Sequence, residues 1–211
     1  MTKLTRRGIS ALLAATALTP SLARAALAPE AQALIGRVEA YLNSITTLKS
    51  RFSQVNPNGT ASAGTVYVDR SRHGMLFDYD PPSKITLIAP GDWRLIFMDG
   101  SIEQVNVLPV NETPLGFLLA DQVRIGGDLM VTDLARERGE ILLTVTRAGA
   151  EDQGHVLLAF IERPIELRRW AVTDPQGLTT VVILEDLQLN QPLESSLFTF
   201  KDPKIFGWPS Q

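Results

Sequence analysis

Short runs in which apolar and polar residues alternate fill most of this chain, and turn-forming residues separate one run from the next. Alternation with a period of two places the apolar side chains on one face of a β-strand. Dipeptides such as Pro90-Gly91 and Asp99-Gly100 are typical of the turns between such strands. The predicted strands are 66–69, 75–79, 85–88, 93–98, 102–108, 129–134, 141–147, 155–162, 166–173, 179–186 and 196–201. This spacing indicates an all-antiparallel barrel or sandwich.

Two segments depart from this pattern and are predicted to be helical. After Pro29, apolar residues recur at spacings of three and four, which gives a helix one apolar stripe. We expect this helix to pack on the sheet, with a helix that binds a partner as the alternative. The second helix begins at Thr113-Pro114, an N-cap residue followed by proline. It is nearly all apolar as far as Ala120, so it needs burial on more than one side.

The first 25 residues are predicted to be a signal peptide for export. Lys3, Arg6 and Arg7 precede an apolar stretch at 8–19, and Ala23-Arg24-Ala25 has the small-x-small pattern of a cleavage site. The stretch is shorter than the ~20 residues that span a bilayer, although an uncleaved anchor remains the alternative. The arginine pair leaves both general and twin-arginine export open. Residues 26–211 are then expected to form a single domain in the periplasm.

Charge and composition exclude several classes of function. The net charge of −3 becomes −7 once the four cations of the signal peptide, Lys3, Arg6, Arg7 and Arg24, are removed. An acidic chain without a basic cluster is not expected to bind nucleic acid. The absence of cysteine excludes disulfides, thiolate metal sites and cysteine nucleophiles. With two histidines and no catalytic or nucleotide-binding motif, we expect no catalytic residue, no metal and no cofactor.

Several phrases of the sequence, in this order, resemble the outer-membrane lipoprotein carrier protein family, LolA. They are LKSRFSQ at 48–54, GTVYVDR at 64–70, FDYDPP at 77–82, PLGFLL at 114–119 and LFTFKDP at 197–203. The resemblance implies a mainly β fold with some α-structure. In that fold, an incomplete, unclosed antiparallel β-barrel has helices covering its concave apolar face.

The resemblance also implies a function. A member of this family is a periplasmic chaperone that carries lipoproteins from the inner to the outer membrane and shields their acyl chains in a hydrophobic cavity, without catalysing a reaction. Its expected partners are acylated lipoproteins, an inner-membrane ABC-type releasing complex and an outer-membrane acceptor; the carrier itself is expected to be a monomer. In the family, an arginine at the end of an early strand bonds to the helical lid and is needed for handing cargo onward. The matching residue is Arg70, but Ser71 replaces the usual proline, so Arg72 remains an alternative.

Alternation predicts which side chains would line the cavity. If Asp78 and Arg94 point outward, their neighbours on the same strands point inward. Apolar residues of the short helix would then contribute to the lid. The predicted acyl-chain contacts are Met75, Phe77, Trp93, Leu95, Phe97, Leu115, Phe117 and Leu118. An ordinary packed core would give the same pattern, so the sequence leaves core and cavity open.

Two other functions are compatible with the residues. One is a periplasmic sensor or regulatory module that binds lipids or lipoproteins on the same half-barrel. The other is a hydrolase or transferase acting on a lipid, which would need a nucleophile or base that converges on the cavity only after folding.

Overall fold

The computed structural model describes residues 28–110, 113 and 116–208. The predicted signal peptide, Pro114 and Leu115 lie outside the described residues. The elements are α1 (Pro29–Ser44), β1 (Thr47–Val55), β2 (Ala61–Asp69), η1 (Arg70–Arg72), β3 (Gly74–Tyr79), β4 (Ile85–Pro90), β5 (Arg94–Asp99), β6 (Gln104–Pro109), η3 (Gly116–Leu119), β7 (Leu129–Glu137), β8 (Glu140–Arg147), η4 (Glu151–Gln153), β9 (His155–Glu162), β10 (Ile165–Thr173), β11 (Thr179–Leu189), η5 (Ser195–Phe198) and α2 (Pro203–Phe206).

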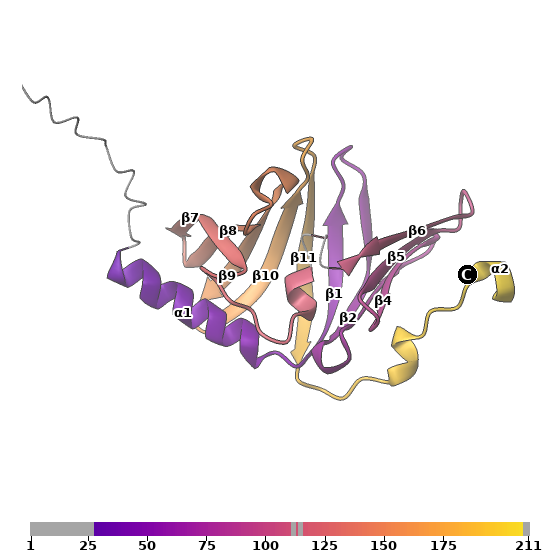
Figure 1. Ribbon diagram of the computed structural model, residues 1–211, viewed down its shortest axis with the longest axis horizontal. Helices are drawn as coiled ribbons and strands as arrows, with labels where there is room; N and C mark the ends of the chain where they lie inside the picture. The colour runs from indigo at the N-terminus through magenta and orange to yellow at the C-terminus, as the bar shows by residue number, and fades with distance from the viewer. Residues whose placement is uncertain (1–27, 111–112, 114–115, 209–211) are drawn as a thin grey trace, which may run out of the picture.

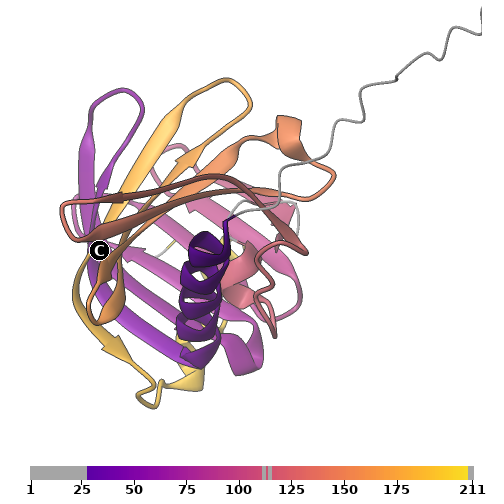
Figure 2. The ribbon, with the colours of Figure 1, turned by 90° about the vertical axis from the view of Figure 1, so that its left-hand side faces the viewer.

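The strands form one antiparallel sheet of eleven strands in the order β6-β5-β4-β3-β2-β1-β11-β10-β9-β8-β7. Within the described residues, β6 and β7 end this order and do not pair with each other. The sheet curls around α1, which lies inside the curve (Figure 1, Figure 2). Register shifts on the β1–β11, β9–β10 and β7–β8 pairs mark bulges, which increase local twist and bending. The predicted fold, an unclosed antiparallel barrel with α-helix on its concave face, is confirmed.

Helix α1 covers the concave face as its apolar stripe predicts. Pro29 lies in its first turn, where the missing N–H leaves no hydrogen bond unmade. Four residues at spacings of one, three and four are buried against the sheet: Leu34, Ile35, Val38 and Leu42. They join the large core on the concave side, which also contains Met75 and Phe77 of β3. The helix lies inside the curve, with residues 116–125 beside it (Figure 2).

A second, smaller core lies on the opposite face of β3 to β6. Ile88, Ile96 and Met98 are buried there, and Phe200 and Trp208 from the C-terminal segment pack against them. The yellow C-terminal segment runs from β11 beneath the sheet to β4 and β5 (Figure 1). This half of the sheet is thus covered on both faces.

The described part of the predicted helix after Thr113 is only the 3₁₀ turn η3 at Gly116–Leu119. Two predicted strand assignments also differ from the structure. Residues 47–55 form a central strand that was not predicted, because Ser50 occupies a buried position and interrupts the apolar alternation. The predicted strand at 196–201 is wrong: η5 occupies its first half, and the rest is not paired with the sheet. Phe198 and Phe200 alternate there because both pack onto the sheet, and not because they belong to it.

Tyr79 gives the concave core a measurable dependence on alkaline pH. Its hydroxyl donates to Gln54 Oε1 over 2.8 Å, and burial raises the pKa of Tyr79 to about 12. An unfolded tyrosine ionises near pH ~10. The contribution of neutral Tyr79 to the free energy of unfolding is therefore fully present below pH ~10 and is lost as the pH rises through about 12. This loss amounts to about 2–3 kcal/mol. In urea unfolding at pH 9 to 12, Tyr79→Phe should lose less stability than the parent chain; equal slopes would contradict this assignment.

Candidate functional site: a lid clasp beside an apolar cavity

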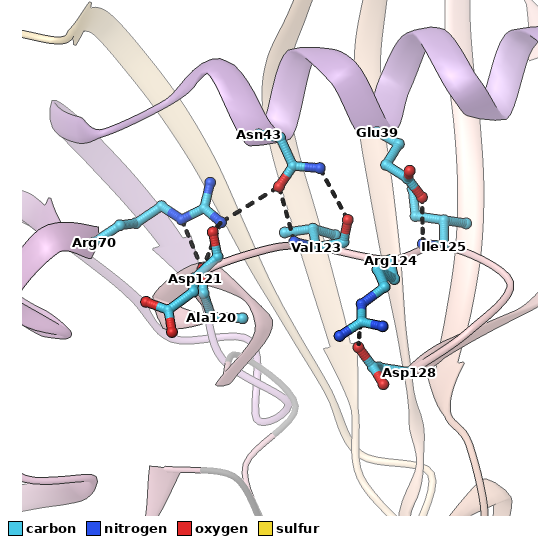
Figure 3. A network of polar contacts seen from close by, with 9 residues as sticks. All are labelled: Glu39, Asn43, Arg70, Ala120, Asp121, Val123, Arg124, Ile125 and Asp128. Carbon is cyan, nitrogen blue, oxygen red and sulfur yellow. Dashed lines mark hydrogen bonds and ion pairs between the residues drawn. The ribbon is translucent and has the colours of Figure 1, made fainter.

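The segment 116–125 crosses the concave face between β6 and β7, and we call it the lid segment. It begins with η3, in which Phe117 and Leu119 are buried in the concave core. Val123 further along is also buried. The lid segment lies beside the C-terminal end of α1, so helix and segment together close the concave face (Figure 3).

Two polar side chains of α1 hold the extended part of the lid segment. Asn43 donates from Nδ2 to the Val123 carbonyl over 2.9 Å and accepts from the Val123 N–H at Oδ1 over 2.8 Å. One turn earlier, Glu39 Oε2 accepts from the Ile125 N–H over 2.6 Å. Positions four apart share one face of a helix, so these two side chains replace the neighbouring strand that the segment lacks (Figure 3).

Arg70 connects the end of α1 to the lid segment. Arg70 is only 8% exposed, and its guanidinium donates to the carbonyls of Leu42 at 2.8 Å and Ile45 at 3.1 Å. From the same group, Nε donates to the Ala120 carbonyl at 3.0 Å and Nη2 to the Asp121 carbonyl at 3.2 Å. We call this set of bonds, with those of Asn43 and Glu39, the clasp (Figure 3).

The electrostatics of Arg70 differ from those of an ordinary surface arginine. Among the described residues its side chain makes no ion pair, and its partners are neutral carbonyls. The carbonyls at the C-terminus of a helix carry partial negative charge, which suits a cation there. Burial lowers the pKa of Arg70, and the charge of Asp121 partly opposes that shift. The clasp therefore holds a buried cation among carbonyl dipoles, of which those of Ala120 and Asp121 are lost when the lid segment moves away.

Arg72, the sequence-based alternative to Arg70, lies elsewhere. Its side chain is about half exposed and forms an ion pair with Asp69 at 3.6 Å. The short η1 turn after β2 directs Arg70 towards the lid segment and Arg72 towards solvent. Replacement of proline by Ser71 thus leaves the strand-end arginine in contact with the lid.

We expect Asn43→Ala to loosen the middle of the lid segment. The change removes both hydrogen bonds to Val123 and leaves its buried N–H without an acceptor, at a cost of about 1–3 kcal/mol. Amide hydrogen exchange at Val123 should accelerate accordingly. Asn43→Asp, which keeps an acceptor for this N–H, is the control and should exchange more slowly than Asn43→Ala. Unchanged protection in Asn43→Ala would show that the segment is held without this side chain.

A cavity of about 660 Å³ lies between the lid segment and the ends of β7, β8 and β9. Its volume is within the ~300–1,000 Å³ usual for sites that bind small molecules. Apolar side chains line one part of it: Trp93, Phe117, Val123, Leu129, Val145 and Val156. Polar side chains lie around the rest: Arg124, Asp128, Arg147, Gln153 and His155. Such a site suits a molecule with an apolar tail and a polar head.

The structure distributes the predicted acyl-chain contacts over three environments. Met75, Phe77 and Leu95 are buried in the concave core, and Phe97 is half-buried on the same face of β5 as Leu95. Phe117 and Leu118 lie on the lid segment, whereas Leu115 lies outside the described residues. Trp93 is 48% exposed. It precedes β5 with a left-handed φ of 63°, so strand alternation does not determine where its side chain points.

Of the predicted residues that the structure describes, only Trp93 and Phe117 line the cavity. The strand residues that complete its apolar wall, Leu129, Val145 and Val156, were not predicted. They stand in ordinary alternating strands, and nothing in the sequence distinguishes them from core residues. Met75, Phe77 and Leu95 make part of the packed floor of the concave face, and Leu118 lines a much smaller pocket of about 20 Å³ beside Arg70.

Two features are absent from the part of the chain that the structure describes. No helix among the described residues has the length and apolarity needed to cross a membrane. The same residues include no group of three or more His, Asp or Glu side chains placed to hold a metal ion.

Comparison with known proteins identifies the family of this chain. The model of the family described as "Outer membrane lipoprotein carrier protein LolA" matches residues 43–201, which is most of the chain. The chain belongs to the LolA family. The matched residues contain Arg70, the lid segment and the apolar wall of the cavity, whereas most of α1 precedes them.

The LolA relatives include outer-membrane lipoprotein carrier proteins of Pseudomonas paraeruginosa and Pseudomonas aeruginosa. Each is 27% identical over 202 aligned residues, covering 90% of this chain and 92% of the relative. Among solved structures, an uncharacterised conserved protein from Thermus thermophilus has a TM-score of 0.48 at 14% identity, with 82% of this chain and 95% of that chain covered. A LolA superfamily protein from Nitrosomonas europaea has a TM-score of 0.43 at 12% identity, covering 81% and 97%. The Pseudomonas aeruginosa MucA/MucB complex has a TM-score of 0.46 at 15% identity, covering 81% and 61%.

Proposed function

We propose that this LolA-family protein is a periplasmic carrier that binds lipoproteins and shields their acyl chains on the concave face of the sheet. The observation that carries the proposal is the clasp, which holds the lid segment over the cavity through hydrogen bonds to Arg70, Asn43 and Glu39. Membership of the LolA family and the likeness to outer-membrane lipoprotein carrier proteins of Pseudomonas support it. The site acts by binding alone, and no covalent step is proposed.

The energetics suit a carrier that binds reversibly. Burying an acyl chain is worth about 0.8 kcal/mol per CH₂, so a triacylated lipoprotein resists leaving a membrane by tens of kcal/mol. A protein cavity that shields part of the chains offsets part of this free energy. Release onto the carrier then requires an energised partner, for which we propose an inner-membrane ABC-type complex. Transfer to an outer-membrane acceptor runs downhill.

The hydrogen bonds of the clasp set the free energy that cargo binding must supply to open the lid segment. Each hydrogen bond contributes roughly 0.5–1.5 kcal/mol, and those to a charged group about 1.5–3 kcal/mol. Several such bonds make a closed state that acyl burial can overcome. They also return the protein to a closed state after delivery, when the apolar surface would otherwise face water.

The test is a release assay with the mature protein. Spheroplasts incubated with it should release lipoproteins into the supernatant, and mass spectrometry of protein purified gently from the periplasm should find triacylated peptides bound. A chain without lipoprotein release that carries a small lipid would instead support a sensor or lipid-binding module. Recovery of the protein from the cytoplasmic fraction alone would refute the periplasmic assignment.

A further inference from the structure

Two aromatic residues with left-handed backbone conformations meet beside the lid segment. His73 has a φ of 50° and Trp93 a φ of 63°. Their rings are 4.5 Å apart between centroids, with 31° between the planes. Positive φ is uncommon for a residue with a side chain and is a strong outlier for one as bulky as tryptophan. Strained positions of this kind cluster at sites where geometry matters for function.

The two turns that carry these rings are packed tightly together. Gly91 has a φ of 99°, and a Cβ atom at this position would lie 2.4 Å from the Arg72 carbonyl oxygen. Only glycine therefore allows the turn before β5 to approach the turn after β2 so closely. The Trp93 carbonyl also accepts a hydrogen bond from the Val110 N–H over 2.8 Å, at the point where the chain leaves β6 for the lid segment. Trp93 is thus fixed by its backbone near the entry to the lid.

His73 contacts the lid segment through both ring nitrogens. Its Nδ1 lies 2.9 Å from the Leu119 carbonyl oxygen, so a protonated Nδ1 donates to it. Its Nε2 lies 3.6 Å from Asp121 Oδ1. Arg70 bonds to the carbonyl of Ala120, which lies between Leu119 and Asp121 in the sequence, and also to the carbonyl of Asp121. His73 therefore contacts the two residues that flank Ala120, the residue whose carbonyl accepts from Arg70.

Trp93 has a second neighbour, the cavity. Its indole contributes to the apolar wall together with Phe117 of the lid segment. The same ring thus contacts the space where a ligand would lie and the imidazole that bonds to the lid. Because Trp93 is half exposed and not enclosed by the core, its side chain has room to turn when that space fills.

We propose that His73 and Trp93 are a coupled pair of positioning residues through which occupancy of the cavity opens the lid segment. This inference rests on the proposed function. A chain that enters the cavity displaces the indole from the imidazole, and the imidazole then loses the packing that aims Nδ1 at Leu119. Because the acyl chain contacts Trp93 differently in the closed and open states, it shifts the equilibrium between them.

The test measures opening directly in the full mature protein. Since the chain contains no cysteine, Asp78→Cys and Gln122→Cys introduce two clean sites for spin labels, one on the outer face of β3 and one on the lid segment. Loss of one aromatic contact or one hydrogen bond corresponds to about a three- to tenfold change in an equilibrium. Without ligand, Trp93→Ala and His73→Phe should each raise the ratio of open to closed lid by about this factor.

The double variant decides whether the two residues act together. If they are coupled, Trp93→Ala combined with His73→Phe raises the ratio no further than the larger single change. Trp93→Phe should restore most of the closed population by restoring a ring. Tyr67→Ala, which removes a partly exposed ring on the face of β2 opposite to Val66 and Val68, is the control and should leave the ratio unchanged. Additive single effects, or an unchanged ratio in both single variants, would overturn the inference.

A triacylated synthetic lipopeptide separates this inference from the proposed function. In the parent chain it should bind and lengthen the distance between labels, whereas in Trp93→Ala it should bind with little further lengthening. Equal lengthening in both proteins would overturn the coupling while leaving the carrier function intact. Failure of the lipopeptide to bind the parent chain would count against the carrier function, and the ligand-free ratios would still decide whether the pair controls the lid.

Discussion

Arg70→Leu should open the clasp and slow the transfer of bound cargo to acceptor liposomes by roughly 30- to 1,000-fold. The change removes the donors for the carbonyls of Leu42, Ile45, Ala120 and Asp121 in one step. Loss of a charged donor to buried carbonyls costs about 2–4 kcal/mol of closed-state stability. Because the closed state competes with the loaded state, its destabilisation raises the affinity for cargo and reduces its release.

The chain offers two controls for this experiment. Arg72→Leu removes a cation two residues away that pairs only with Asp69 among the described residues, and it should transfer at close to the parent rate. Arg70→Lys keeps the charge but loses the planar fork that reaches several carbonyls, so an intermediate rate is expected. Fluorescent lipopeptide transfer, with unfolding measured in parallel, gives both quantities. A parent-like rate for Arg70→Leu would show that the clasp does not control transfer.

Phe97→Glu should abolish lipopeptide binding in a folded protein, whereas Phe77→Glu should unfold it. Phe77 is 2% exposed and makes edge-to-face contacts with Phe52 at 5.3 Å and Trp170 at 6.3 Å between centroids. Even truncation of such a ring to alanine costs about 3–5 kcal/mol, and an unpaired buried carboxylate costs more. Phe97 is half-buried on the same face, where a charge can still reach water while it disfavours an acyl chain.

Circular dichroism and lipopeptide binding on both variants separate the two effects. Phe77→Ala provides a folded reference, with a free energy of unfolding about 3–5 kcal/mol below that of the parent chain. Phe97→Tyr should bind nearly as well as the parent chain, since it adds a hydroxyl without a charge. Normal binding by Phe97→Glu would place the acyl chains away from β5. A stable, folded Phe77→Glu would show that this position is less enclosed than its packing indicates.

The alternation of Met75, Phe77 and Tyr79 was sufficient to place these side chains on the concave face, and the stripe after Pro29 was sufficient to predict the covering helix. Both are consequences of local backbone geometry, because the period of a strand or helix fixes which side chains share a face. The unclosed barrel followed from the ordered resemblance to LolA and is confirmed by the strand order. The faces of these elements could be predicted because each depends on residues that are close together in the sequence, whereas the barrel was inferred from the family resemblance.

The site depended on tertiary structure. The period of apolar residues in a strand does not show whether the space next to them is filled by other side chains. It therefore could not distinguish Phe77, which is packed in the core, from Leu129, Val145 and Val156, which line the open cavity. Nor could it give the partners of Arg70 and Asn43, which bond to residues fifty to eighty positions away. These residues come into contact only when the lid segment folds back across α1. The sequence by itself therefore determined the faces of the elements, whereas the folded chain decided which arginine meets the lid and where a ligand can fit.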